Sequence, residues 1–316
     1  MKKILVTGDG YEPHHFATLR TAGYDVLHLP GDPPLSQVRD ALVDASAHML
    51  GGSERFGADE FGLAKKLELI SFVGTGIGAF VDEALARAHG VKTLRTPPVM
   101  APAVAELTVG LLLCVYRAIC VQNRAAKQSD TSVCVSRELA GARVGVIGLG
   151  NIGRRVAAML SDTFGAQVAY HATTRKPDAE LAHNLSYKAL DDLLRWSEVV
   201  ILTLPTNAQT ENLIDSARLA LLPPNAVLIN TAGPRLVDPY ALKQALQSGA
   251  LATAAFDGYY AEPLPDPADD PWGLLALPDD KFIITPHTAA KTPQTWQRMV
   301  DHAVRNVVNH ASEVQA

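Results

Sequence analysis

Apolar and polar segments alternate along the chain in a pattern that predicts short strands separated by helices. In the first hundred residues, short β-rich apolar runs lie at 3–8, 25–29, 48–52, 69–74 and 91–96. The segments between them, near 14–21, 34–44, 58–66 and 81–89, have helical periodicity or composition. Apolar residues in these strand segments tend to be continuous rather than alternating, which is typical of a parallel sheet covered on both faces. We therefore expect one α/β unit of about a hundred residues at the start of the chain.

A long helix is expected after this unit. The sequence TPPV at 96–99 predicts a stiff hinge, and Pro102 then occupies a position that a first helical turn tolerates. The helix should run from 102 to about 127. It is apolar on nearly every side, so more than one side must be buried. An oligomer interface and burial between two domains both explain this pattern.

A second alternating unit follows a polar stretch. Its predicted strands lie at 144–150, 167–171, 199–205, 226–230, 253–258 and 282–287. The segment from Thr295 onward is helix-like and could return to the first unit.

Composition narrows the class of protein. The chain has 316 residues, of which 47% are hydrophobic and 19% charged, so two packed domains are expected. The net charge of −5, without a basic run, gives no reason to expect a nucleic-acid or membrane partner. Three cysteines without metal-ligand spacing, Cys114, Cys120 and Cys134, are interpreted as reduced thiols of a cytosolic protein. The uncharged run 107–116 is too short for a bilayer that needs about 20 residues.

A dinucleotide site is predicted where the strand 144–150 meets the next helix. The pattern Gly148-x-Gly150-x-x-Gly153 follows a strand and opens a helix within a βαβ unit. The first glycine allows a tight turn, the second lets the backbone approach a pyrophosphate, and the third lets helix and strand pack closely. The pyrophosphate would lie on the helix N-terminus, which includes Asn151 and Ile152.

The end of the next strand favours NADP(H) over NAD(H). An NAD site usually places Asp or Glu there, whereas this chain has His171, followed by Thr173, Thr174, Arg175 and Lys176. These hydroxyls and cations could bind a 2′-phosphate, which a carboxylate would repel. The alternative is that Arg175 and Lys176 are ordinary solvated loop charges.

Four further segments resemble one family. They are residues 73–113, the segment 204–230, the block FDGYYAEPLP and the block ITPHTAAKT. Together with the glycine motif they make the chain similar to the D-isomer-specific 2-hydroxyacid dehydrogenases, from about residue 45 to the C-terminus.

The resemblance implies an α/β fold of two doubly wound parallel-sheet domains with a cleft between them. A flavodoxin-like substrate domain would comprise 1–98 and 289–316, and a Rossmann cofactor domain would comprise 99–288. The long helix near 102–127 would build a homodimer.

The resemblance also assigns roles to single residues. It places His287, in TPH, as the general acid/base and Glu262, in AEPLP, as its partner. A carboxylate beside an imidazole favours the protonated ring, which could protonate the carbonyl oxygen of a 2-oxo acid during reduction. Each residue also has a structural explanation, as a turn cap or a satisfied buried histidine. Other implied cofactor contacts are Pro205, Thr210, Thr231, Ala232 and Asp257, the last at the nicotinamide carboxamide.

The catalytic arginine of the family is absent. The family's block runs Asn-x-Ala-Arg-Gly-x-x-Val-Asp, and here Gly233 occupies the arginine position between Asn230 and Val237-Asp238. Arg235 could replace the missing guanidinium, although Pro234 sets the chain direction before it. Alternatively, Arg235 pairs with a carboxylate such as Asp238 or lies on the surface.

Substrate contacts and function are therefore open to more than one reading. The loop 74–78 keeps Thr75, Gly76 and Ile77, whose backbone N–H groups could hold a carboxylate, and Ser53 lies near another edge of the expected cleft or is surface. The leading hypothesis is a cytosolic NADP(H)-dependent oxidoreductase acting on a small 2-oxo or 2-hydroxy acid or a close analogue, with no metal site. The alternatives are a non-catalytic cofactor-binding regulator or sensor on the same fold, and a dehydrogenase retuned to a substrate that is not an α-keto acid.

Overall fold

The chain forms two compact units. The computed structural model describes residues 1–132 and 135–315, so Cys134 lies outside the described residues. Unit 1 comprises Met1–Met100 and Lys291–Ala316, and unit 2 comprises Ala101–Ala290. The boundaries expected from the sequence were 98/99 and 288/289.

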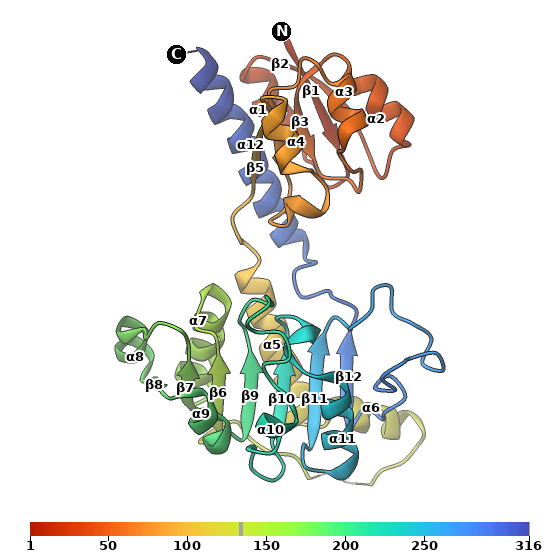
Figure 1. Cartoon of the computed structure of the whole chain (residues 1–316). Helices are drawn as coiled ribbons and strands as arrows, with labels where there is room; N and C mark the ends of the chain where they lie inside the picture. The colour runs from red at the N-terminus through yellow and green to blue at the C-terminus, as the bar shows by residue number, and fades with distance from the viewer. Residues whose placement is uncertain (133–134, 316) are drawn as a thin grey trace. The chain divides into compact units, whose positions relative to one another are not determined.

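Unit 1 contains a five-stranded parallel sheet (Figure 1). Its strands are β1 (Lys2–Thr7), β2 (Tyr24–Leu29), β3 (Ala45–Leu50), β4 (Leu69–Phe72) and β5 (Lys92–Arg95), in the order β2-β1-β3-β4-β5. This is the flavodoxin-like strand order. The strand expected at 48–52 begins three residues earlier, because Ala45, Ser46 and Ala47 are small enough to be buried on a sheet covered on both faces.

Helices cover both faces of this sheet. One face packs against α1 (Pro13–Thr21) and the C-terminal helix α12 (Pro293–Gln315). The other face packs against α2 (Leu35–Leu42), α3 (Ala58–Leu63) and α4 (Glu83–Ala88). Neighbouring residues of β1 alternate between the two cores, with Ile4 in the first and Leu5 in the second. The last helix therefore completes the core of the first unit, because Val300 and Val307 are fully buried in it.

Unit 2 contains a seven-stranded parallel sheet. Its strands are β6 (Arg143–Ile147), β7 (Gln167–His171), β8 (Ser186–Tyr187), β9 (Val199–Leu202), β10 (Val227–Asn230), β11 (Thr253–Asp257) and β12 (Phe282–Thr285). The order β12-β11-β10-β9-β6-β7-β8 is that of a Rossmann sheet with one added strand, and it confirms the predicted fold class. Strand β8 escaped the sequence pattern because its two residues are exposed at the sheet edge.

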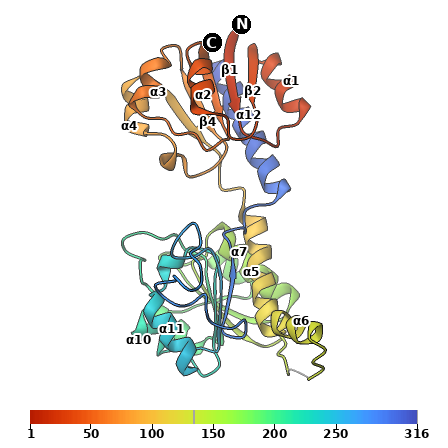
Figure 2. The same ribbon diagram turned by 90° about the vertical axis from the view of Figure 1, so that its right-hand side faces the viewer.

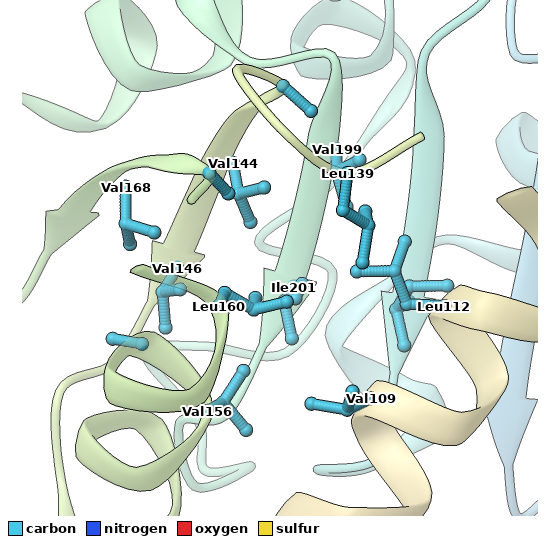
Figure 3. Packing of buried hydrophobic residues seen from close by; sticks show 14 of the residues in the cluster. Val109, Leu112, Leu139, Val144, Val146, Val156, Leu160, Val168, Val199 and Ile201 are labelled. Carbon is cyan, nitrogen blue, oxygen red and sulfur yellow. The ribbon is translucent and has the colours of Figure 1, made fainter. Parts of the chain in front are cut away.

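The faces of the second sheet are covered by different helices (Figure 2). Helices α5 (Ala101–Tyr116) and α7 (Asn151–Ala158) lie on one face, and α9 (Leu190–Trp196), α10 (Ser216–Leu219) and α11 (Pro239–Ser248) on the other. Figure 3 shows Val109 and Leu112 of α5 beside Ile201 of β9, in the same cluster as Val156 of α7. The short helix α8 (Pro177–His183) follows β7.

The expectation of one continuous helix from 102 to 127 was wrong. Helix α5 ends at Tyr116 and a second helix, α6 (Ile119–Lys127), leaves at 58° to it. Ala118 adopts a left-handed conformation with φ of 50°, which breaks the helical hydrogen-bond series. Neither Gly nor Pro occurs in the break, so none of the usual sequence signals of a helix end is present there.

Helix α5 has packing partners that neither expected explanation named, because they belong to its own unit. Much of its apolar surface packs inside unit 2, against β10, β11 and α7. None of the α6 residues is buried. The homodimer built on this segment stays a prediction.

No single helix in the described part of the chain is long and apolar enough to span a membrane. The bent pair α5 and α6 meets the length and composition requirement only when its two helices are taken together.

The packing of α5 predicts a stability effect. Leu112 is fully buried, whereas Leu113 is only partly buried against the same cluster. Leu112→Ala should lower the free energy of unfolding of unit 2 by about 2–5 kcal/mol, through lost burial and the cavity left behind. Denaturant unfolding measures this, with Leu113→Ala as the control that costs clearly less. Equal costs for the two variants would contradict the position of α5 in the core of its own unit.

Candidate active site

The structure requires glycine for different reasons at two of the three glycine positions of the β6–α7 turn, and not at the third. Gly148 has φ of +97°, and a Cβ there would lie 2.9 Å from the backbone nitrogen of Leu204. At Gly153 a Cβ would lie 2.1 Å from the Gly148 carbonyl oxygen, so helix and turn can approach only through a glycine. A Cβ on Gly150 would meet no atom within 4 Å. The protein itself requires the first and third glycines, and the second leaves open the space where a pyrophosphate would approach.

A pocket of about 530 Å³ lies at this turn, on unit 2. The first turn of α7 carries no side-chain cap, so its N–H groups are available to an anion. Of the predicted cofactor residues, the pocket is lined by Gly148, Gly150, His171, Thr173, Thr174, Pro205 and Thr210. The sequence did not single out four further lining residues, Leu190, Asn207, Gln209 and Leu213. The predicted residues outside its lining are Asn151, Ile152, Gly153, Arg175, Thr231, Ala232 and Asp257.

The end of β7 changes the expected role of Arg175. Its Nε and Nη2 each donate to a different oxygen of Glu180, both at 2.8 Å, and the Tyr170 hydroxyl donates to the same carboxylate at 2.7 Å. The bonds from Arg175, followed by that from Tyr170, lower the pKa of Glu180 to about 2. The Nε/Nη2 edge of the Arg175 guanidinium is therefore engaged by Glu180, whereas Lys176 lines the pocket.

His171 stands at the position where an NAD site usually has an acidic residue. Its Nδ1 lies 3.1 Å from the Lys188 carbonyl oxygen, so Nδ1–H donates to that oxygen, and in the neutral ring Nε2 is then a hydrogen-bond acceptor. The ring lines the same pocket as Thr173 and Thr174.

His287 and Glu262 form a hydrogen-bonded pair after the last strand. The Nδ1 of His287 lies 2.9 Å from Oε1 of Glu262. Both side chains are exposed, at 67% and 58%. His287 has φ of 52°, an uncommon conformation for a residue other than Gly and one that is often found at functional sites. With Nδ1–H donated to the carboxylate, Nε2 is free to exchange a proton with a bound molecule.

Asp257 holds the turn that carries His287. Its buried carboxylate accepts hydrogen bonds from the Thr285 hydroxyl at 2.6 Å, the Thr288 N–H at 2.8 Å and the Ala289 N–H at 2.9 Å. These bonds fix the backbone on both sides of His287. The contact of Asp257 with a nicotinamide carboxamide stays a prediction.

The block around Gly233 is pinned by its neighbours. The Asn230 side chain donates to the Gly233 carbonyl at 2.8 Å and accepts from the Ala232 and Gly233 N–H groups, both at 3.1 Å. The Thr231 hydroxyl lies 2.7 Å from that of Thr108 on α5. The turn beyond β10 is thus fixed through both side chain and backbone.

Arg235 does not form the pair suggested for it. Asp238 caps α11, accepting from the N–H groups of Tyr240 and Ala241, both at 2.9 Å. Within the described residues the Arg235 guanidinium has no hydrogen bond or ion pair, and the residue lies exposed in the 3₁₀ turn Pro234–Leu236. Of the two alternatives to a catalytic role, Arg235 therefore does not pair with Asp238, whose carboxylate caps α11, and it lies on the surface of its unit.

The predicted substrate residues of unit 1 differ in which of their groups could contact a ligand. In the part of the chain that the structure describes, the N–H groups of Thr75 and Gly76 donate to no protein acceptor, which suits an anion nest. The Ile77 side chain is fully buried in the core of unit 1, so only its backbone could meet a ligand. Ser53 donates both its hydroxyl and its N–H to Asp32, at 2.6 and 3.1 Å.

Among the described residues, His14, His15 and Asp301 come close enough together to suggest a metal site. The hydrogen bonds argue against it. His15 Nδ1 accepts the Glu12 N–H at 2.9 Å, so the proton of the neutral ring is on Nε2, which faces Asp301 at 3.0 Å. A metal on Nε2 would require Nδ1 to be protonated against that N–H. The group is better explained as a link between α1 and α12.

Comparison with known proteins decides the family. Residues 109–289 match the NAD-binding domain of the D-isomer specific 2-hydroxyacid dehydrogenases. This chain belongs to that family. The resemblance predicted from the motifs is thereby confirmed, together with the class of a 2-hydroxyacid oxidoreductase that uses a nicotinamide cofactor.

Relatives of the chain cover nearly its whole length. It is 31% identical to the glyoxylate reductase of Aeropyrum pernix, over 89% of this chain and 83% of the relative. It is also 31% identical to the glyoxylate/hydroxypyruvate reductase B of Citrobacter koseri, over 90% and 88%. The crystal structure of the TT0316 protein from Thermus thermophilus covers 96% of this chain and 95% of its own, with a TM-score of 0.80 and 32% identity. The likeness to other dehydrogenases of the family extends therefore to both units.

The glycine turn gives a prediction that separates folding from binding. Gly153→Ala should destabilise the protein, because its Cβ would overlap the Gly148 carbonyl. Gly150→Ala should fold normally but weaken nucleotide binding, because its Cβ would occupy only the space open to a ligand. Thermal unfolding and fluorescence titration with NADPH measure the two effects. A Gly150→Ala variant with unchanged nucleotide affinity would contradict the placement of the pyrophosphate.

Proposed function

We propose that this protein is an NADP(H)-dependent reductase that interconverts a small 2-oxo acid, or a close analogue, and the corresponding 2-hydroxy compound. The observation that carries the proposal is the His287–Glu262 pair, joined at 2.9 Å and presented in a left-handed turn at the carboxyl edge of the cofactor-domain sheet. The relatives that reduce glyoxylate and hydroxypyruvate support a small substrate.

The geometry of the His287–Glu262 pair supports a proton-transfer role for His287. A bound nicotinamide supplies or accepts the hydride. As the carbonyl carbon of the substrate is reduced, negative charge develops on its oxygen, and the proton on Nε2 of a doubly protonated His287 neutralises that charge. Glu262 accepts the hydrogen bond from Nδ1–H, which orients the imidazole, and its negative charge stabilises the charged ring. In oxidation the same nitrogen takes the proton from the hydroxyl group.

The cofactor preference rests on the residues around His171. Lys176, Thr173 and Thr174 line the pocket, and no Asp or Glu is found among the described residues that line it. A 2′-phosphate would therefore meet a cation and two hydroxyls and no like charge. Arg175 contributes less than the sequence suggested, because Glu180 engages two of its nitrogens.

A second candidate function follows from Gly233. A family member without the arginine could bind the cofactor as a regulator or sensor without turnover, or could act on a substrate that is not an α-keto acid. Retention of both members of the His287–Glu262 pair favours catalysis. A cytosolic homodimer with contacts through α5 and α6 completes the proposal; Ile119 of α6, 48% exposed, would contribute to such a contact.

The cofactor preference predicts tighter binding of NADPH than of NADH. A charge-assisted contact to the 2′-phosphate contributes about 1.5–3 kcal/mol, or roughly ten- to a hundredfold in affinity. Fluorescence titration of the wild type, Lys176→Ala and Arg175→Ala with both nucleotides tests this. Lys176→Ala should remove most of the preference and Arg175→Ala little of it. Equal affinity of the wild type for the two nucleotides would refute the proposal.

The proton-transfer role predicts the effect of removing the imidazole. His287→Ala should lower kcat for 2-oxo acid reduction by about 10²–10⁴ while leaving NADPH affinity nearly unchanged, since the ring does not line the nucleotide pocket. Glu262→Gln should cause a smaller loss, because the amide oxygen can still accept Nδ1–H. His183→Ala, at a surface histidine of α8, is the matched control. Near-normal turnover by His287→Ala would show that the assignment is mistaken.

A further inference from the structure

The position that lacks the arginine is occupied by another side chain. Gly233 has φ of 165° and ψ of 133°, an extended conformation that any residue adopts, so its backbone does not demand glycine. The Thr206 side chain is what occupies the space beside Gly233, and it would have to rotate to admit a larger residue at 233. A Cβ built on Gly233 would lie 2.5 Å from Oγ1 of Thr206, closer than real Cβ contacts. The Thr206 hydroxyl thus lies where a side chain at 233 would begin.

Both segments that meet here are held in place. The Asn230 amide pins residues 230–233, as described above. On the Thr206 side, the Thr210 hydroxyl donates to the Pro205 carbonyl at 2.8 Å and accepts the Asn207 N–H at 2.9 Å. The approach of Thr206 to Gly233 is therefore a property of two fixed turns.

The Thr206 hydroxyl is available to a ligand. The residue is exposed, and its side chain has no hydrogen-bond partner among the described residues. It follows β9, which neighbours β10 in the sheet, and it is flanked by Pro205 and Asn207 of the nucleotide pocket. His287 follows β12, two strands beyond β10, so it lies about 10 Å along the sheet edge from Gly233. The imidazole and the hydroxyl therefore stand at the same edge of the sheet.

We propose that Thr206 is the specificity-determining residue of this site, and that its hydroxyl, in place of a guanidinium at 233, hydrogen-bonds the substrate on the side away from His287. This inference rests on the proposed reductase function. The substrate class follows from the chemistry of the donor. An arginine fork binds a carboxylate through two parallel charge-assisted bonds, whereas a threonine hydroxyl donates one bond and carries no charge. The site therefore takes small carbonyl compounds without depending strongly on a carboxylate beside the carbonyl.

The hydroxyl is tested by isosteric replacement. Thr206→Val should lower kcat/KM for the best carbonyl substrate about three- to tenfold, the range of one neutral hydrogen bond. Thr206→Ser should restore it to within about twofold. The control is Thr253→Val, which removes a threonine hydroxyl from the opposite end of β11, where it bonds the Asp280 carbonyl at 2.7 Å. Unchanged kcat/KM in Thr206→Val would overturn the inference.

A double-mutant cycle tests the link to Gly233. Gly233→Ala should cause a loss similar to that of Thr206→Ala, because its methyl group displaces the hydroxyl, and the double variant should lose no more than either single variant. Additive losses would show that the two positions act independently and would contradict the proposal. A loss above about a hundredfold in Arg235→Ala, with Thr206→Val unaffected, would assign the substrate contact to Arg235 instead.

Substrate choice is the most direct readout. With NADPH, the wild type should reduce methyl pyruvate with a kcat/KM within about tenfold of that for pyruvate. The reason is that the Thr206 hydroxyl donates one uncharged hydrogen bond, which the carboxylate charge of pyruvate strengthens only a little. A preference for pyruvate above about a thousandfold, or failure to reduce either compound, would overturn the inference. The proposed reductase function fails separately, if the wild type oxidises NADPH with none of a panel of 2-oxo acids, aldehydes and ketones, whereas turnover retained in His287→Ala refutes only the proton-transfer role. Activity that is lost in His287→Ala and unchanged in Thr206→Val refutes the Thr206 role alone.

Discussion

The candidate site depends on one buried carboxylate. Asp257, at the end of β11, accepts three hydrogen bonds from the turn that follows the neighbouring strand β12. A buried charge is stable only when it is fully hydrogen-bonded, so the turn cannot relax without leaving that charge unsatisfied. The same bonds hold His287 in its left-handed conformation, from which the ring reaches Glu262. The His287–Glu262 pair is thus positioned by the pairing of two parallel strands.

The other features of unit 2 follow from the same sheet edge. Parallel strands end together, so the turns after β6, β9, β10, β11 and β12 meet along one line. Along it lie the open space at Gly150, the Thr206–Gly233 contact and the His287–Glu262 pair. The nucleotide pocket, the proposed substrate contact and the proposed proton donor therefore follow one another in strand order. In this proposal, glycine at 233 changes the middle member of the series and leaves the other two in place.

The sequence predicted the fold and the proximity of His287 and Glu262 because both are encoded locally. Continuous apolar runs marked the strands, the glycine pattern marked the turn before α7, and two short blocks carried Glu262 and His287. What the sequence could not predict depended on contacts between distant residues. The α5–α6 break contains no Gly or Pro that would have predicted it. The carboxylate of Asp238, expected to pair with Arg235, instead caps α11. The Thr206–Gly233 contact joins residues 27 positions apart in the chain, in turns that only the sheet brings together.

We propose that the chain is a reductase although Gly233 stands at the position of the family's arginine. The decisive experiment is rapid mixing of NADPH-bound protein with glyoxylate or pyruvate, followed under single-turnover conditions. We expect oxidation of one equivalent of NADPH per active site and, from pyruvate, formation of the D-isomer of the 2-hydroxy acid. Bound NADPH that stays reduced in the presence of both compounds, in a protein that is folded and saturated with nucleotide, would contradict it.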